Sequence, residues 1–153
     1  MTFSKMAYFL FFSFMSLMVW SQTEDEVILK KMVLESFDDI WSDLDTATIS
    51  KYYTDDFLLL EHGELWTVDT IVHYVLGAKK RSPKVERKNR IEFIDFRIEG
   101  DRAWIAYHNY AQLFLEGELI RDLHWLESAT AIRREGVWKF DMLHSTRVKW
   151  NKG

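Results

Sequence analysis

The sequence predicts an α+β fold in which helices pack on one face of a curved antiparallel sheet. Three observations lead to this prediction. Helical patterns come first after an apolar leader, long strand-like runs occupy the second half of the chain, and short glycine-containing turns separate those runs. Helices and strands that are segregated along the chain are typical of α+β domains rather than of alternating α/β domains.

Residues 1–21 have the pattern of a secretory signal peptide. One charge, Lys5, precedes the apolar run 6–20, and a polar and acidic segment follows. The apolar run is short for a spanning helix, which needs about 20 apolar residues. We therefore expect a periplasmic or secreted chain, cleaved between Ser21 and Gln22 and free of the membrane afterwards. An uncleaved anchor is the alternative.

Two helical segments are expected next. Thr23 and Glu26 form a capping-box pattern, and Asp45 is suited to begin a short second helix that ends near Tyr53. Between them, apolar residues recur at the spacing of one helix face. These residues are Leu29, Val33, Phe37, Ile40, Trp41 and Leu44.

A hairpin and a third helix follow. Residues 54–56 are predicted to form a turn, residues 57–61 a strand, and His62-Gly63 a tight turn into a returning strand at 64–66. From Thr67 an apolar stripe fits a helix, which Pro83 ends. The stripe consists of Val68, Ile71, Val72, Val75 and Leu76.

The rest of the chain is predicted to form long antiparallel strands joined by short turns. They span residues 85–99, 102–116, 119–134 and 137–150. Large apolar residues occur on both faces, as the neighbours Trp104 and Ile105 illustrate. In a sheet with one face in water, apolar and polar residues alternate more regularly along each strand. We therefore expect the second face to be covered, most simply in a homodimer.

Composition excludes several classes of protein. The formal net charge is −4, or −5 without the leader and its Lys5, whereas nucleic-acid-binding proteins carry a basic footprint. The basic residues between 79 and 88, which include Arg87, are expected to form a solvated helix end and loop, with an anion-binding patch as the alternative. The chain has no cysteine, so its stability depends on packing rather than on disulfides.

Three stretches carry a family resemblance through their order and spacing. They are IWSDLDTATISKYYTDDF (40–57), DRAWIAY (101–107) and RREGVWKFDMLHST (133–146). Together they resemble the nuclear transport factor 2-like superfamily, in its SnoaL-like and ketosteroid-isomerase-like branches and a small bacterial branch of unknown function. The resemblance implies one cone-shaped domain over residues 22–153, in which a curved antiparallel sheet wraps around N-terminal helices and leaves a pocket at the wide end.

Seven residues are predicted to line this pocket. They are His144, His108, Tyr110, His124, Trp41, Tyr53 and Trp66. His144 is the leading candidate because it matches the His of the family's terminal motif and shares a period-2 face with Trp138 and Phe140. For each of the seven, packing or hydrogen bonding in a purely structural role is the alternative.

Asp141, Asp95 and Asp122 are candidates for a general base, because aspartate is uncommon inside strands and an apolar site shifts a carboxyl pKa toward neutrality. Pairing with Arg97 and Arg121 on the outer surface is the alternative for Asp95 and Asp122. The Asp–Tyr and Asp-Arg-Asp arrangements that the resemblance implies for its enzymes follow no motif here, so enzymatic activity stays open.

No cofactor is expected. The sequence has no glycine-rich phosphate loop and no Gly-x-Ser-x-Gly elbow, and its histidines lack the spacing of a zinc site.

Two functions remain. The first is binding of a small hydrophobic molecule, with cofactor-free isomerase- or hydrolase-like chemistry on it. The second is a non-catalytic structural or protein-interaction domain of the same fold. A cavity of about 300 Å³ or more with converging polar groups favours the first. A mouth closed by Trp41 and Trp66 favours the second.

Overall fold

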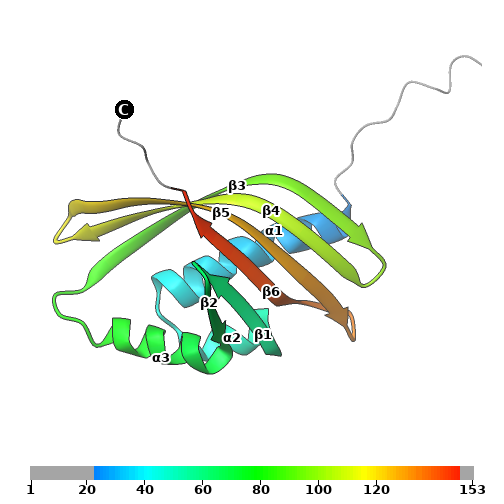
Figure 1. The fold of residues 1–153 in the computed structure, drawn as a ribbon, viewed down its shortest axis with the longest axis horizontal. Helices are drawn as coiled ribbons and strands as arrows, with labels where there is room; N and C mark the ends of the chain where they lie inside the picture. Colours follow the sequence, from blue (N-terminus) through cyan, green and yellow to red (C-terminus); the bar gives the residue numbers. More distant parts are fainter. Residues whose placement is uncertain (1–22, 149–153) are drawn as a thin grey trace, which may run out of the picture.

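The computed structural model describes residues 23–148, in which a strongly curved sheet arches over a set of helices (Figure 1). Helix α1 (Glu24–Ser36) begins at the predicted cap, where the Thr23 hydroxyl accepts a 3.2 Å hydrogen bond from the Glu26 amide. Leu29 and Val33 are fully buried on the predicted apolar stripe. The signal peptide prediction lies outside the described residues.

The end of α1 changes its geometry. Residues Phe37–Ser42 (η1) form a π-helix, in which one extra residue per turn widens the helix. Asp45 then caps a 3₁₀ turn, Thr46–Thr48 (η2), by accepting a hydrogen bond from the Ala47 amide. A single α-helical turn, Ile49–Tyr52 (α2), completes the predicted short helix.

Strand β1 (Tyr53–Glu61) starts directly after α2, so the predicted turn at 54–56 is wrong. Tyr53 and Thr54 are buried side chains of this strand, and their burial favours an extended backbone despite the turn-forming residue types. The pairing of β1 with β6 is irregular between Tyr53 and Leu58. Strand β2 (Glu64–Thr67) returns through the predicted His62-Gly63 turn. Helix α3 (Val68–Lys79) follows, capped by the Thr67 side chain.

Four long strands complete the sheet, close to the predicted bounds. They are β3 (Val85–Glu99), β4 (Arg102–Leu115), β5 (Glu118–Arg134) and β6 (Val137–Arg147). The strand order is β2-β1-β6-β5-β4-β3. All neighbours are antiparallel except β1 and β6, which are parallel. The sheet is therefore mostly antiparallel, and the α+β class is confirmed.

Four of the strand pairings contain a register shift, and the β-bulges in β6 and β3 change which side chains face inward. In β6, Phe140 pairs with Ala131 and Met142 with Thr130, so Asp141 is an extra residue. In β3, Ile94 is the extra residue between Phe93 and Asp95. An extra residue reverses the alternation beyond it.

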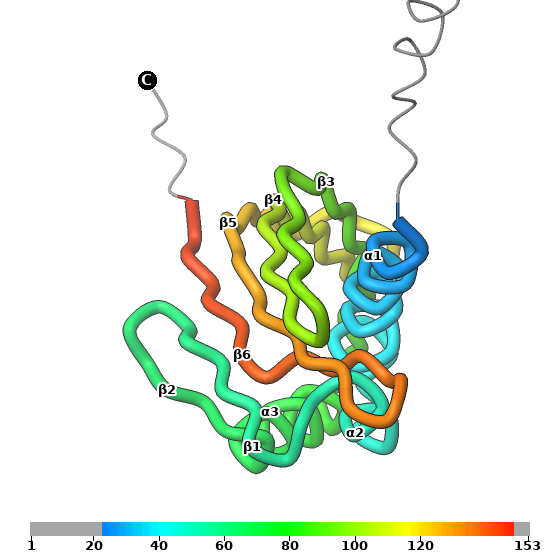
Figure 2. Tube along the Cα trace, turned by 90° about the vertical axis from the view of Figure 1, so that its right-hand side faces the viewer, coloured from blue at the N-terminus to red at the C-terminus, as the bar shows by residue number. Residues whose placement is uncertain are grey.

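The core lies between the helices and the concave face of the sheet, where α1 flanks β3 and α3 lies beneath β1 and β2 (Figure 2). Small inward residues, such as Ala129 and Ala131 in β5, leave room for the helices. On the convex face, Trp104, His108 and Tyr110 are half-buried, with no described element over them. No helix within residues 23–148 has the length and apolar character needed to cross a bilayer.

Helix α1 offers a matched test of this packing. Leu29 is fully buried and Leu34 is 43% exposed on the same helix. Leu29→Ala should lower the free energy of unfolding by about 2–5 kcal/mol, as buried truncations do, and Leu34→Ala by about 0.5 kcal/mol or less. Urea denaturation measures both. Equal losses would contradict this placement of α1.

Candidate functional site

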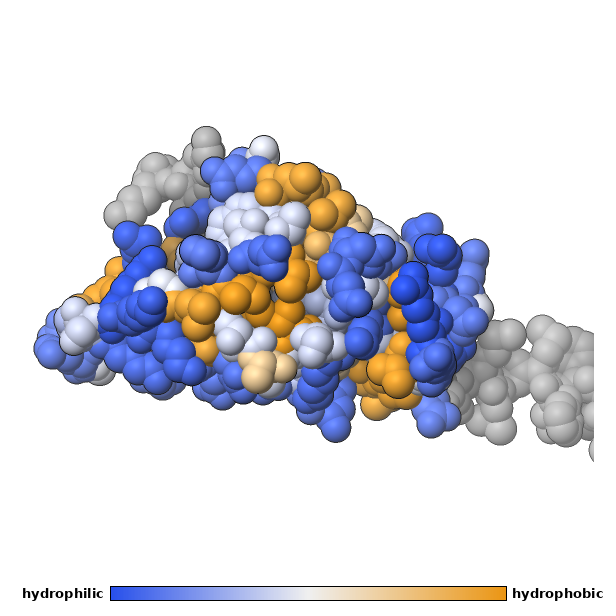
Figure 3. All heavy atoms as spheres, turned by 90° about the horizontal axis from the view of Figure 1, so that it is seen from below, coloured by the Kyte–Doolittle hydropathy of each residue, from blue (hydrophilic) through white to orange (hydrophobic). Residues whose placement is uncertain are grey.

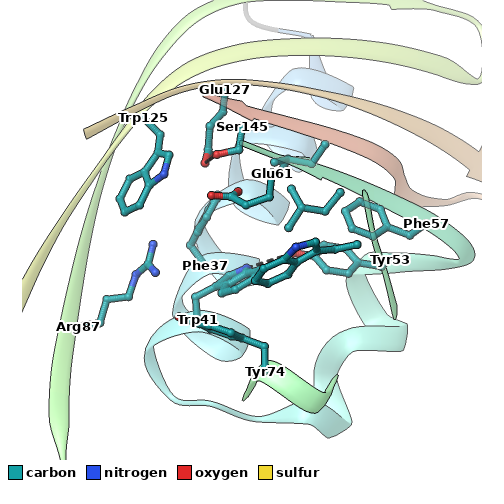
Figure 4. Close-up of a pocket in the computed structure, with 13 residues that line it drawn as sticks. Phe37, Trp41, Tyr53, Phe57, Glu61, Tyr74, Arg87, Trp125, Glu127 and Ser145 are labelled. Carbon is teal, nitrogen blue, oxygen red and sulfur yellow. Dashed lines mark hydrogen bonds between the residues drawn. The ribbon is translucent and has the colours of Figure 1, made fainter. Parts of the chain in front are cut away.

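A cavity of about 100 Å³ opens between the helices and the concave face of the sheet. Its lining is mostly aromatic but contains a compact set of polar groups (Figure 4). The lining residues are Phe37, Trp41, Tyr53, Phe57, Leu59, Glu61, Trp66, Tyr74, Arg87, Trp125, Glu127, Leu143 and Ser145.

The polar groups form a row across four strands. The register pairs Tyr107 of β4 with Glu127 of β5, Glu127 with Ser145 of β6, and Ser145 with Glu61 of β1. Directly paired residues point to the same face of a sheet. The row therefore brings two carboxyl groups and two hydroxyl groups to the concave wall.

Glu127 is the centre of this row and is almost fully buried. Its carboxyl group accepts hydrogen bonds from the Ser145 hydroxyl, at 3.0 Å, and from the Asn109 amide, at 3.4 Å. Burial raises the pKa of Glu127 to about 7, a rise that the negative charge of Glu61 strengthens and that Ser145 and Arg87 oppose. A carboxyl with this pKa can both donate and accept a proton near neutral pH.

Glu61 connects the row to the protein surface. Burial also raises the pKa of its carboxyl group, against the effect of the neighbouring His62. The His62 Nε2 atom lies 2.8 Å from the Glu61 carboxylate and 3.4 Å from Nε1 of Trp125. His62 is 41% exposed at the hairpin turn, so the polar wall ends at a solvent-accessible imidazole.

Among the described lining residues, Arg87 is the one cation. Its Nε donates a 2.8 Å hydrogen bond to the Asn89 side chain. Asn89 in turn donates to the Phe37 carbonyl, at 3.3 Å, and to the Ser42 hydroxyl, at 2.7 Å. Both acceptors belong to the π-helix, so this irregular helix end fixes the orientation of Arg87.

Aromatic side chains form the remaining walls. The Trp41 indole donates a 3.3 Å hydrogen bond to the Tyr53 hydroxyl, and the Tyr53 ring stacks on Phe57 at 4.0 Å between centroids. Tyr74 of α3 contacts both Trp41 and Trp66. Figure 3 shows the molecule from below the view of Figure 1, which is the side where α3 lies. Residues of high and intermediate hydropathy interrupt the polar surface there.

Of the seven predicted lining residues, the structure places Trp41, Tyr53 and Trp66 in the cavity wall. His144 is exposed instead, while its neighbours Leu143 and Ser145 line the cavity. The bulge at Asp141 causes this difference, because it ends the alternation that would have turned His144 inward.

His108, Tyr110 and His124 also lie outside the cavity, on the convex face. The two imidazoles share a 2.9 Å hydrogen bond, the Tyr110 and His124 rings stack at 4.3 Å, and the Arg90 guanidinium covers Tyr110. Their strands place the odd-numbered residues inward, so these even-numbered residues face outward. The prediction that they line the pocket is therefore wrong.

The aspartate candidates for a general base are likewise not in the cavity lining. Asp95 pairs with Arg97 at 3.3 Å, as the alternative reading anticipated. Asp122 is exposed. Asp141 occupies the bulge and accepts a hydrogen bond from the Thr130 hydroxyl.

Sequence reasoning missed Glu127, Glu61, Arg87 and Ser145. One signal could have found Glu127. It interrupts an apolar period-2 series in β5 whose other members are Leu123, Trp125, Ala129 and Ala131. Arg87 gave no such signal, since it stands within a cluster of basic residues.

The arrangement suits proton transfer or hydrogen bonding to a small ligand. Within residues 23–148, no group of three or more His, Cys, Asp or Glu side chains converges as metal ligands would. The chemistry that the described side chains can supply is a carboxyl poised near neutrality, a cation and aromatic contact surface.

Solved structures match this fold over almost their whole length. A conserved protein from Planctomyces limnophilus has a TM-score of 0.70 at 16% identity, over 81% of this chain and 98% of that one. A nuclear transport factor 2-like protein from Cytophaga hutchinsonii has a TM-score of 0.62 at 18% identity, over 82% and 99%. A ketosteroid isomerase-like protein from Erwinia carotovora atroseptica has a TM-score of 0.65 at 13% identity, over 84% and 99%.

No family model and no curated protein matches the sequence. The structural matches establish that the chain has the nuclear transport factor 2-like fold, which the resemblance implied. At such low identity they concern the fold alone, and one fold serves many functions.

The raised pKa of Glu127 predicts a pH effect on stability. Between the ordinary value of 4.5 and about 7, the folded protein holds a proton that the unfolded chain has lost. The stabilising contribution of the Glu127 carboxyl to the free energy of unfolding is therefore fully present below pH 4.5 and is lost as the pH rises through 7. Glu127→Gln removes this titration, so its stability relative to wild type should increase by about 3 kcal/mol between pH 4.5 and 8.

Urea denaturation across this pH range measures the difference. Glu118→Gln, at an exposed position of the same strand, is the matched control and should show no comparable trend. A difference between Glu127→Gln and wild type that stays constant with pH would contradict the buried, protonated carboxyl.

Proposed function

We propose that this domain binds a small organic molecule in the cavity and exchanges a proton with it through Glu127. The observation that carries the proposal is the Glu127 carboxyl, which is buried on the cavity wall with a pKa of about 7. The same group would serve cofactor-free isomerase- or hydrolase-like chemistry, because such reactions need a residue that takes up and returns a proton at neutral pH.

The cavity volume restricts the ligand. At about 100 Å³ it is smaller than the roughly 300–1,000 Å³ typical of drug-sized ligands. A compact ligand fits this space, while a larger one requires side chains of the wall to move. Tyr74, which is 42% exposed, is the side chain that we expect to move.

The small volume also favours the alternative function, a non-catalytic domain whose pocket its own side chains fill. In that case the hydrogen bonds of Glu127 to Ser145 and Asn109 would only satisfy buried polar groups. The two functions differ in their response to compact ligands, which only the first would retain.

Native mass spectrometry of protein purified from the periplasm of its own source tests the proposal. We expect a mature chain that begins at Gln22 and a retained small molecule. Leu143→Phe, which adds volume to the cavity wall, should remove the retained molecule, whereas Leu60→Phe, at an exposed position of β1, should keep it. A ligand-free wild-type chain that also binds no compact compound would favour the structural alternative, and a chain that keeps residues 1–21 would contradict export.

We also propose that the convex face forms a homodimer. Trp104 and Tyr110 are half-buried there, and Leu126 and Ile94 are 45% and 55% exposed. An apolar face of this kind suits a two-fold contact between identical chains.

Leu126→Glu tests the dimer by placing a charge in this face. Light scattering after size-exclusion chromatography should report a dimer for the wild type and a monomer for Leu126→Glu. Leu65→Glu, at an exposed position of β2, is the control and should remain dimeric. A monomeric wild type would contradict the proposal.

A further inference from the structure

Arg87 has no ionic partner among the residues that the structure describes. The ion pairs within residues 23–148 do not include it, and its one hydrogen bond uses Nε, to Asn89. The two Nη groups therefore have no acceptor among residues 23–148. Figure 4 shows the guanidinium pointing into the space between Trp125 and Trp41.

Arg87 is half-buried, and the partial loss of water around its guanidinium is unfavourable unless an anion or another acceptor replaces that water. Burial lowers the pKa of Arg87, but a guanidinium stays protonated in proteins. A charge removed from water without a hydrogen-bonded partner of opposite sign lowers stability. Glu61 and Glu127 attract Arg87 without forming an ion pair with it among the described residues, so the Nη groups can donate hydrogen bonds to an anion.

The geometry of the free groups favours one kind of anion. A guanidinium fork matches the two oxygens of a carboxylate. A doubly charged phosphate would meet a single cation and two glutamate side chains in the same cavity, so a singly charged group is the better match. The Trp125 ring, 5.6 Å from the guanidinium carbon, and the aromatic walls provide contact surface for an apolar body.

We infer that the cavity binds a small organic monocarboxylate, with its carboxylate on the Nη groups of Arg87 and its apolar portion against the aromatic wall. This inference rests on the proposed function and specifies its ligand class. The volume of about 100 Å³ favours short aliphatic acids, and the larger benzoate tests whether side chains of the wall move to admit it.

Calorimetric titration with matched pairs tests the inference. The probes are acetate, propionate, butyrate and benzoate, each compared with its neutral amide. We expect each carboxylate that binds to do so at least tenfold more tightly than its amide, the effect of a charge-assisted hydrogen bond. Arg87→Gln should remove this preference and leave amide binding unchanged.

Two further variants complete the design. Arg87→Lys keeps the charge without the fork and should retain part of the preference. Arg97→Gln, at an exposed arginine of the same strand that pairs with Asp95, should bind like the wild type. If Arg87→Gln does not fold, as judged by circular dichroism, the comparison of acids with amides on wild type and Arg87→Lys decides the question.

The outcomes separate the inference from the proposed function. Equal binding of acids and amides, or tighter binding of inorganic phosphate, would overturn the monocarboxylate and leave ligand binding intact. Failure of every probe to bind the wild type would overturn the monocarboxylate, while a different molecule retained by the protein from its source would still support the proposed function.

Discussion

The hydrogen bond between Ser145 and Glu127 depends on a register that runs across four strands. Glu127 can be buried on the concave wall only because β4 and β6 present Asn109 and Ser145 as donors beside it. A slip of one residue in either strand would turn its donor to the opposite face and leave a buried carboxyl without it. The bulge at Asp141 is therefore part of the site, since it turns Leu143 and Ser145 inward.

The opposite side of the cavity depends on the irregular end of the first helix. The Phe37 carbonyl at the start of the π-helix accepts hydrogen bonds from the Asn89 side-chain amide and from the Ser42 hydroxyl, and Ser42 at its end accepts a second hydrogen bond from Asn89. Asn89 then holds the Nε of Arg87. The positions of the polar wall residues thus depend on strand register, and the orientation of Arg87 depends on the irregular end of the helix. Both are unusual backbone features at a candidate functional site, where such features are over-represented.

The fold was largely predictable from the sequence because caps, turn residues and periodic apolar residues are local signals. Thr23, Asp45 and Thr67 all begin helical segments as expected, and the four long strands begin within one residue of their predicted starts. The site was only partly predictable. Trp41, Tyr53 and Trp66 line the cavity as predicted. The prediction for His144 assumed an unbroken alternation of side chains along the last strand, which the bulge at Asp141 reverses. The prediction for His108 required a choice between two apolar faces of the same strand. Burial of Glu127 and Arg87 arises from contacts between distant segments, which local patterns do not encode.

The parallel pairing of β1 with β6 also has a consequence for folding. It joins residues 53–61 to residues near the end of the described chain, which is among the contacts of largest sequence separation in the domain. Closing so long a loop is entropically unfavourable and slow. Until the last strand arrives, Glu127 lacks the Ser145 hydroxyl and β1 lacks its pairing with β6, so Glu61 and Ser145 are not side by side. A nascent or truncated chain could thus form its helices and most of its sheet and still contain no cavity, so the capacity to bind a ligand would appear only with the final step of folding.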